Sequence, residues 1–182
     1  MHEEFDPLES NVDNSDKLVD LLKYKKSYLM QRFVKLSYDK WRETRKRLDG
    51  TYESKWKEST DKEWNRKHGT DYVDIANTEF EDLPSNRQKE RMDAASVAID
   101  LVFDKIKDWE IRVTTEMIEE MSSVVHDNWL ERREQAQDEV DSMLVQSYKN
   151  LSEEEKVKDR NHIYIAIQII KEEIEAIKSE QK

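Results

Sequence analysis

Glycine and proline are almost absent from this chain, with only two of each among its 182 residues. Glycine adopts the left-handed conformations that end many helices, and proline interrupts a helix because it has no backbone N–H. A chain with so few of both has few places where a helix must stop. The sequence therefore predicts long helices and a mainly α fold.

Charged residues make up 40% of the chain and its mean hydropathy is −1.03, values that on their own favour disorder. The hydrophobic 36% includes five Trp, seven Tyr and four Phe. Because each large aromatic side chain buries about 150–250 Å², few positions can supply much of a core. The length suits one compact domain, or two small subdomains that share a core.

The formal net charge of −11 disfavours binding to nucleic acid or to an anionic membrane surface, because like charges repel. The chain has no Cys, which excludes disulfides, thiolate zinc sites and Cys nucleophiles and fits a reducing compartment. No run approaches the ~18 consecutive apolar residues of a membrane span, and the segment MHEEFDPLES is acidic, unlike a signal peptide. We therefore expect a cytoplasmic protein.

Residues 1–14 show no periodicity, and we expect them to form a mobile tail. Asn14 or Ser15 then offers a side-chain oxygen that can cap a helix. Beyond this cap, apolar residues recur at steps of three and four with one gap of seven, which is typical of a helix with one buried side. We expect this helix to reach about Leu48 and to end at Asp49-Gly50.

Residues 51–82 show no sustained helical period and mix single aromatic residues with Asp, Asn, Thr and a Gly. A structureless loop of this length is unusual in a compact domain, so we expect its aromatic residues to hold it against the helices. A short β-hairpin around Tyr72-Val73-Asp74-Ile75 is an alternative for part of it.

A second helix is predicted to open at Pro84-Ser85, where Ser85 and Gln88 have the spacing of a capping box. A third helix begins near Thr114 or Thr115 and runs through Trp129. The buried side of the second helix is expected to contain Ala94, Ala95, Val97, Ala98, Leu101, Val102 and Ile106.

The last predicted helix starts at Ser152, which forms another capping box with Glu155. Three Glu occupy its first turn, where the positive end of the helix dipole favours acids. Its apolar stripe continues to the C-terminus and contains Ile163, Ile165, Ile167, Ile169, Ile170, Ile174 and Ile177.

The second half of the chain can be aligned with the first. Residues 38–45 align with residues 126–133 at an offset of 88, which places Trp41 over Trp129. Residues 80–83 align with residues 148–151 at an offset of 68, so the first copy carries about 20 additional residues in its loop. The Trp, the loop aromatic, the Leu and the helix start recur in the same order, which indicates a duplication.

This duplication predicts two pseudo-symmetric helical repeats, each consisting of helix, aromatic loop and capped helix, packed as one compact domain. The first repeat spans residues 15–109 with the extended loop 51–82. The second repeat spans residues 110–182.

Both copies contain motifs of a known module. The second copy has His126-x-x-Trp129 followed by Leu144-Val145-x-x-Tyr148-x-x-Leu151-Ser152-Glu153-Glu154-Glu155-Lys156-x-Lys158-Asp159-Arg160. The first copy has Trp41-Arg42-x-Thr44-Arg45, Asp49-Gly50-Thr51-Tyr52 and Val73-Asp74-Ile75-Ala76-Asn77-Thr78-x-Phe80-x-Asp82-Leu83-Pro84. These segments resemble the RyR-type repeat, which occurs in tandem in ryanodine receptor calcium channels and in uncharacterised bacterial and phage proteins.

The likeness to the RyR-type repeat covers roughly residues 30–170. The family is implicated in adenine-nucleotide binding, so the resemblance implies a nucleotide-binding helical module. This chain departs from the family where Gln146-Ser147 replaces a usual Pro, and its second copy lacks the Gly-Trp-x-Tyr-Gly segment of the channel repeats. A ligand site formed by that segment is therefore not expected in the same form.

The sequence contains no motif that points to catalysis. Its four His include no pair at i, i+4, and Asp71, Asp74 and Asp82 lack the spacing of an EF-hand loop. No Gly-x-Ser-x-Gly, Walker loop or dinucleotide fingerprint occurs. We expect no metal, no cofactor and no enzymatic activity.

Binding of a small molecule is better supported. An aromatic face beside a guanidinium can hold a purine ring and its phosphate, through stacking worth ~1–3 kcal/mol and charge-assisted hydrogen bonds. The candidate ligand-binding residues are Trp41, Arg45, Trp64, Asn77, Arg91, Trp129, Arg132, Tyr148 and Arg160.

Our first hypothesis is a non-catalytic module that senses or sequesters a nucleotide-derived small molecule in a groove between the two copies, where at least one Trp and two Arg converge. The alternative is a helical protein-interaction module, a homodimer or a modulator of a host factor. It would act through its acidic surface and its Ile-rich last helix.

Overall fold

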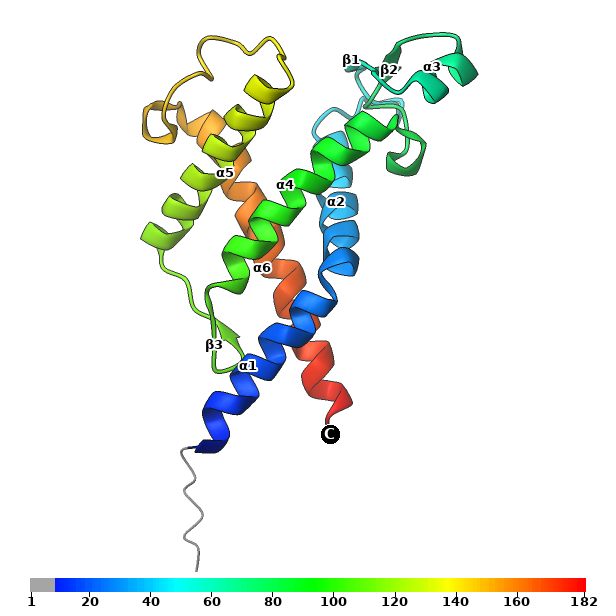
Figure 1. Ribbon diagram of the computed structural model, residues 1–182. Coiled ribbons are helices and arrows are strands. Elements are labelled where there is room, and N and C mark those ends of the chain that lie inside the picture. Colours follow the sequence, from blue (N-terminus) through cyan, green and yellow to red (C-terminus); the bar gives the residue numbers. More distant parts are fainter. Residues whose placement is uncertain (1–8) are drawn as a thin grey trace, which may run out of the picture.

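The computed structural model describes residues 9–182, and residues 1–8 lie outside the described part of the chain. Helices dominate the described part, which confirms the predicted mainly α fold (Figure 1). These helices are α1 (Glu9–Tyr24), α2 (Lys26–Glu43), α3 (Lys62–His68), α4 (Ser85–Phe103), α5 (Thr115–Gln135) and α6 (Glu153–Glu180).

Two small antiparallel hairpins and two 3-10 turns connect the helices. The hairpins pair β1 (Trp56–Glu58) with β2 (Tyr72–Asp74) and β3 (Ile106–Lys107) with β4 (Glu110–Ile111). The 3-10 turns η1 (Phe80–Asp82) and η2 (Tyr148–Asn150) precede α4 and α6. The proposed boundary between the repeats, at residues 109 and 110, falls where the turn after β3 meets the first residue of β4.

The first predicted helix begins earlier than expected. Residues 9–14, which we assigned to a mobile tail, are helical, so the helix does not start at a cap formed by Asn14 or Ser15. The segment is polar and acidic, and acids are favourable at the positive end of a helix dipole, so a lack of apolar residues does not stop the helix there. The rest of the expected tail lies outside the described residues.

This helix is also broken in two at Lys25, whose backbone adopts φ −84° and ψ 4°. The side chain of Lys25 donates a hydrogen bond of 2.5 Å to Glu173 of α6. The gap of seven in the apolar pattern, from Leu22 to Leu29, spans this break, and both leucines are fully buried. The bend therefore lets α1 and α2 share one core.

α2 ends at Glu43, before the end expected near Leu48. The chain turns back at this point, because the backbone N–H of Glu53 donates to the carbonyl of Arg45 at 2.8 Å. Asp49-Gly50 forms the tip of this return, with Gly50 at φ +84°, a conformation that glycine adopts readily. These residues make a turn outside the helix and do not form the helix end.

The long loop of the first half contains a short antiparallel strand pair, as expected, but the predicted segment forms only its second strand. β2 pairs with β1, with Lys57 opposite Val73. Helix α3, between the two strands, was not predicted. Tyr38 of α2 holds the loop in place: its hydroxyl donates to the carbonyls of Ile75 and Thr78, the latter at 2.7 Å. The Tyr38 ring lies in a buried cluster with side chains of the loop, Val73, Ile75 and Leu83.

Asp61 caps two helices at once. One carboxylate oxygen accepts from the backbone N–H of Trp64 in α3 at 3.0 Å, and the other accepts from the N–H of Ser85 at the start of α4 at 3.0 Å. The predicted start of α4 is confirmed, but the predicted capping box is wrong. Gln88 instead donates to the carbonyl of Leu83 at 2.8 Å, because Asp61 already occupies the helix end.

The helix starts of the second half agree with the sequence. The Thr114 side chain accepts from the N–H of Met117 and caps α5, and the Ser152 side chain accepts from the N–H of Glu155 and caps α6. In both cases the capping residue and its partner are three positions apart. Such local caps can therefore be recognised from sequence alone.

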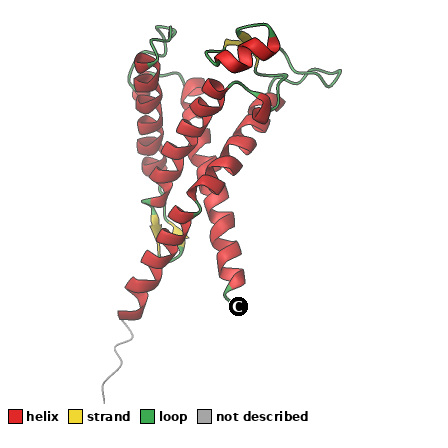
Figure 2. Ribbon diagram, turned by 45° about the vertical axis from the view of Figure 1, so that its right-hand side comes forward, coloured by secondary structure: helices red, strands yellow, loops and turns green. Residues whose placement is uncertain are grey.

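α6 forms the centre of the core and packs against α2, α4 and α5 (Figure 2). Leu29 of α2, Ile99 of α4 and Ile118 of α5 all join one buried cluster with it, so both halves share a core. The buried isoleucines of α6 are Ile163, Ile165, Ile169, Ile170, Ile174 and Ile177.

None of the helices within residues 9–182 combines the length and apolar character that crossing a membrane requires.

Replacing Tyr38 with Phe should destabilise the fold, because the carbonyls of Ile75 and Thr78 would lose their buried donor. We expect the free energy of unfolding to fall by about 1–3 kcal/mol in urea denaturation. Tyr164→Phe is the matched control, since Tyr164 is 52% exposed on α6. Equal stability of the two variants would contradict the anchoring role of Tyr38.

The stabilising effect of Asp61 should depend on pH. Its hydrogen bonds to backbone N–H groups lower its pKa from 3.8 to about 2. A carboxyl group with a lowered folded-state pKa contributes stability above its unfolded pKa and loses that contribution as pH falls through the folded pKa. The melting temperature of Asp61→Asn should therefore lie below that of the wild type at pH 6, and this gap should narrow from about pH 4 to pH 2. Asp71→Asn, at an exposed position, is the control; a gap independent of pH would contradict this role.

Candidate ligand-binding groove

Trp41 and Trp129 have similar surroundings. The Trp41 ring stacks on Tyr38 with 5.8 Å between ring centroids, and Arg45 lies 5.7 Å from the centroid of Trp41. The Trp129 ring stacks on His126 at 6.0 Å, and Arg133 lies 5.5 Å from the centroid of Trp129. The residue numbers in each of the pairs 38 and 126, 41 and 129, and 45 and 133 differ by 88.

The connections that follow also correspond, at an offset of 68. Each consists of a 3-10 turn, a leucine and a long helix, beginning at Phe80 and at Tyr148. The Tyr38 hydroxyl donates to the carbonyl of Thr78, and Nε2 of His126 donates to the carbonyl of Gln146 at 2.9 Å. Matching contacts of this kind are expected if the two halves arose by duplication. The duplication itself stays a prediction.

The two halves differ in the side chain that contacts the ring of Tyr38 or of His126 from the following helix. Arg91 of α4 lies 4.4 Å from the Tyr38 ring centroid, whereas Asp159 of α6 lies 3.3 Å from Nδ1 of His126. Burial raises the pKa of Asp159 and lowers the pKa of Arg91 to about 10. The cation in one half thus corresponds to a carboxyl group in the other.

The candidate residues of the first half form two groups. Trp41, Arg45 and Arg91 lie together, and the half-buried Trp41 ring already contacts both guanidinium groups and Tyr38. Trp64 and Asn77 fix the loop instead. Nε1 of Trp64 donates to the carbonyl of Asp82 at 2.9 Å, and the amide of Asn77 donates to the carbonyl of Tyr52 at 3.0 Å.

In the second half, Tyr148 and Arg160 meet at one carboxylate. The Tyr148 hydroxyl donates to Glu119 at 3.0 Å, and Nε of Arg160 donates to Glu119 at 2.5 Å. Arg160 also binds Glu153 at 2.9 Å. Both candidate side chains are therefore occupied by contacts within the chain.

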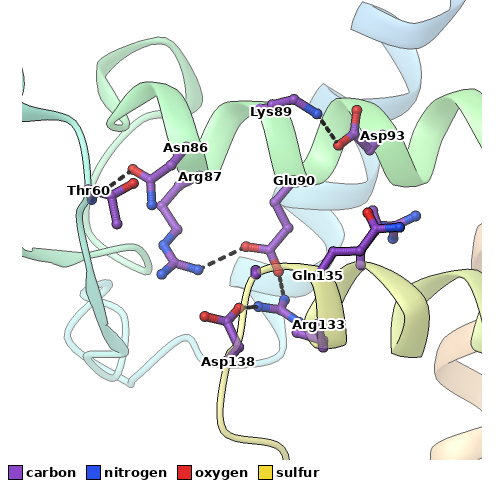
Figure 3. A pocket seen from close by; sticks show the side chains of 11 residues that line it. Thr60, Asn86, Arg87, Lys89, Glu90, Asp93, Arg133, Gln135 and Asp138 are labelled. Atoms are coloured by element: carbon purple, nitrogen blue, oxygen red, sulfur yellow. Dashed lines mark hydrogen bonds and ion pairs between the residues drawn. The ribbon is translucent and has the colours of Figure 1, made fainter.

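Arg132 lies in a different setting, a groove of about 430 Å³ between the N-terminal half of α4 and the C-terminal end of α5 (Figure 3). The groove thus lies between the first half and the second. None of the described residues that line it is aromatic, so the expected convergence of a Trp with two Arg is not found there. The lining consists of Thr60, Asn86, Arg87, Lys89, Glu90, Asp93, Arg132, Arg133, Gln135, Ala136 and Asp138.

Three of the four cations in the groove are neutralised by carboxylates. Arg87 binds Glu90 at 2.9 Å, and Lys89 binds Asp93 at 2.6 Å. Arg133 bridges the two helices through Glu90, and it also binds Asp138 at 2.6 Å. Figure 3 shows these pairs along the wall of the groove.

Arg132 is the exception. Its Nη1 donates to the side chain of Asn128, its Nε is buried with no hydrogen-bond partner, and no carboxylate of the described residues lies within 4.0 Å of its guanidinium. Desolvation lowers its pKa. A half-buried cation without a counter-ion is costly, and its planar N–H groups suit a carboxylate or phosphate.

Sequence reasoning found Arg132 but missed the other groove residues. Arg133 is its direct neighbour, and Arg87, Lys89 and Glu90 lie at the start of a predicted helix. Basic residues near the ends of predicted helices are common, so they are only a weak indication of a binding site. Their convergence depends on how α4 packs against α5, which a sequence pattern does not reveal.

Comparisons of the chain with protein-family models, curated proteins and solved structures found no match.

The ligand-free protein should tolerate the loss of Arg132 better than the loss of its neighbour Arg87. Arg132→Met removes a desolvated charge and keeps an apolar side chain of similar length, so we expect the free energy of unfolding to stay equal or rise by about 1 kcal/mol. Arg87 donates to the carbonyl of Glu58 at 2.8 Å and pairs with Glu90. We expect Arg87→Met to lose about 1–3 kcal/mol. Equal losses in urea denaturation would mean that Arg132 is a structural residue.

Proposed function

We propose that the protein is a non-catalytic binding module that senses or sequesters a small anionic ligand of the nucleotide type in the groove between α4 and α5. The observation that carries the proposal is the guanidinium of Arg132, which has a buried unpaired Nε in a groove where the other cations are neutralised. A phosphate group bound at the guanidinium would supply the missing counter-charge.

The size of the groove supports a small-molecule ligand. Its volume of about 430 Å³ falls within the ~300–1,000 Å³ that is typical of small-molecule pockets. The chain provides 42 acidic residues against 31 Lys and Arg, so counter-ions for Arg132 are not scarce. A guanidinium left unpaired in such a chain therefore favours an external anion as its partner.

The nucleotide character of the ligand rests on the resemblance to the RyR-type repeat, which we carry into the proposal. The matched stacks at Trp41 and Trp129 agree with a repeated unit. In this proposal the stacks support the helices that form the groove, and the phosphate end of the ligand binds Arg132. The rings of Trp41 and Trp129 do not contact the ligand.

The interaction-module alternative rested on two features, the acidic surface and the isoleucine stripe of α6. The buried isoleucines of this stripe belong to the chain's own core and are not available to a partner, whereas the acidic surface remains available. Ile170 is fully buried, and Ile174 and Ile177 are each 2% exposed. The ligand-binding proposal is therefore the one that we develop.

Thermal unfolding at constant ionic strength tests the proposal with phosphate, ATP, ADP-ribose and cyclic AMP as ligands. A ligand at about 100 times its Kd stabilises the folded state by about 2.7 kcal/mol, which should raise the melting temperature by several degrees. The rise should disappear in Arg132→Met and persist in Lys35→Met, a control on α2 whose side chain is 71% exposed.

Two results would contradict the proposed function. One is a wild-type melting temperature that none of the four ligands changes. The other is a ligand-induced rise of the same size in Arg132→Met, which would place the ligand elsewhere.

A further inference from the structure

The end of the groove next to the β1–β2 hairpin contains two uncharged polar side chains. Thr60, in the loop that follows β1, and Asn86, in the first turn of α4, both line the groove. Oδ1 of Asn86 accepts from the backbone N–H of Thr60 at 3.3 Å, and Figure 3 shows the two residues next to each other. This contact holds the two side chains together at one end of the groove.

The same contact fixes which end of the Asn86 amide is available to a ligand. Only the oxygen of an amide accepts from an N–H group, so the bond to Thr60 turns Oδ1 toward the loop and leaves Nδ2 as a donor. Within residues 9–182, neither Nδ2 of Asn86 nor the hydroxyl of Thr60 makes a hydrogen bond. This end of the groove therefore offers one oriented N–H donor beside one hydroxyl, which can donate or accept.

The guanidinium of Arg132 lies toward the opposite end. α4 and α5 run in opposite directions, because the short β3–β4 hairpin connects them (Figure 1). Arg133 of α5 binds Glu90 of α4, which fixes how the two helices are aligned. Nη1 of Arg132 donates to Asn128, one turn back along α5, and this direction leads away from Asn86.

The distance between the two ends is that of a nucleotide and not that of a simple anion. Asn86 and Asp93 both line the groove and lie seven positions apart on α4. A helix rises about 1.5 Å per residue, so these positions are about 10 Å apart along the helix axis. A phosphate ion would occupy only the Arg132 end, whereas a phosphate ester with a ring-shaped organic group can reach both ends.

The charges along the groove wall favour a ligand with one anionic end. Arg87 and Arg133 share Glu90, and Arg133 also binds Asp138. The lining residues include four cations and three carboxylates, which leaves one positive charge, that of Arg132. The part of the ligand that lies beyond Arg132 would therefore meet neutralised ion pairs and then the uncharged end of the groove, which suits an uncharged polar group.

We propose that Thr60 and Asn86 bind the nucleobase of the ligand while Arg132 binds its phosphoryl end, so that the groove selects nucleoside phosphates over sugar phosphates and inorganic phosphate. Nδ2 of Asn86 donates to a ring nitrogen or carbonyl oxygen of the base, and the Thr60 hydroxyl accepts from or donates to the neighbouring group. This inference rests on the proposed function and adds two specificity-determining residues to the same groove.

Isothermal titration calorimetry at constant ionic strength tests the inference with AMP and ribose 5-phosphate, which share the phosphoryl group and the sugar and differ in the base. AMP should bind the wild type more tightly by about tenfold or more, the gain expected from two hydrogen bonds. Asn86→Asp keeps an oxygen that accepts from the N–H of Thr60 and removes the donor. It should reduce the ratio of the two Kd values to less than about threefold. The ratio is the readout because the added negative charge weakens both ligands alike.

Three further variants complete the test. Thr60→Val removes the hydroxyl and keeps the backbone N–H, so it should lower the ratio by about threefold. Asn161→Asp makes the same chemical change as Asn86→Asp at an exposed position of α6 outside the groove, and it should leave the ratio unchanged. Arg132→Met should weaken AMP and ribose 5-phosphate together by about tenfold or more. Circular dichroism melting curves establish that each variant is folded.

The outcomes separate the inference from the proposed function. If AMP and ribose 5-phosphate bind the wild type equally, or if Asn86→Asp leaves their ratio unchanged, the nucleobase inference is wrong and the anion-binding proposal stands. An equal fall of the ratio in Asn161→Asp would also contradict the inference. If AMP, ribose 5-phosphate and inorganic phosphate all fail to bind the wild type, the proposed function fails and the inference fails with it.

Discussion

Packing against α6 is the interaction on which the rest of this structure depends. α6 places its isoleucines against α2, α4 and α5, and it carries Glu173, which is 5% exposed and binds Lys25 at 2.5 Å. The two helices that meet around Lys25 are thereby tied to the C-terminal helix. Since α4 and α5 also pack on α6, their outer ends are held at fixed positions with the groove between them, and Arg132 faces that groove.

The charges at the groove differ from those elsewhere on the helices. Many surface cations pair with a carboxylate three or four positions away, as Lys89 does with Asp93, and such exposed pairs contribute about 0–1 kcal/mol. Arg132 is partly desolvated and has no such partner. Positions that break the local rules of a fold are often functional sites, and here the broken rule is charge pairing in a strongly acidic chain.

The sequence predicted features that depend on neighbours in the chain. Ser152 was recognisable as a cap because its partner Glu155 lies three residues away, and the start of α5 was expected near Thr114 or Thr115. Apolar residues at steps of three and four located the long helices. Asp61 was not recognisable as the cap of α4, because its contact with Ser85 joins residues 24 positions apart. The break at Lys25 was missed for a similar reason, since it contains no Gly or Pro and is fixed by Glu173 of α6.

The same distinction applies to the site. Trp41 and Trp129 stood out in the sequence because aromatic residues are rare and their spacing repeats, yet both side chains are half-buried and already contact side chains of the chain itself. Arg132 was found through its position beside Trp129. Arg133 carries no distinguishing local pattern, because the carboxylate of Glu90 that it shares with Arg87 comes within reach only after folding.

The central claim is that the packing around α6 leaves the guanidinium of Arg132 without a counter-ion from the chain, so that an external anion binds it. A crystal structure of the protein grown with ADP would test this claim most directly. The account predicts a phosphate oxygen at about 2.7–3.2 Å from a guanidinium nitrogen of Arg132. It would be contradicted by a structure in which Asp93 has moved onto Arg132 and fills that position, with the nucleotide bound elsewhere or not bound at all.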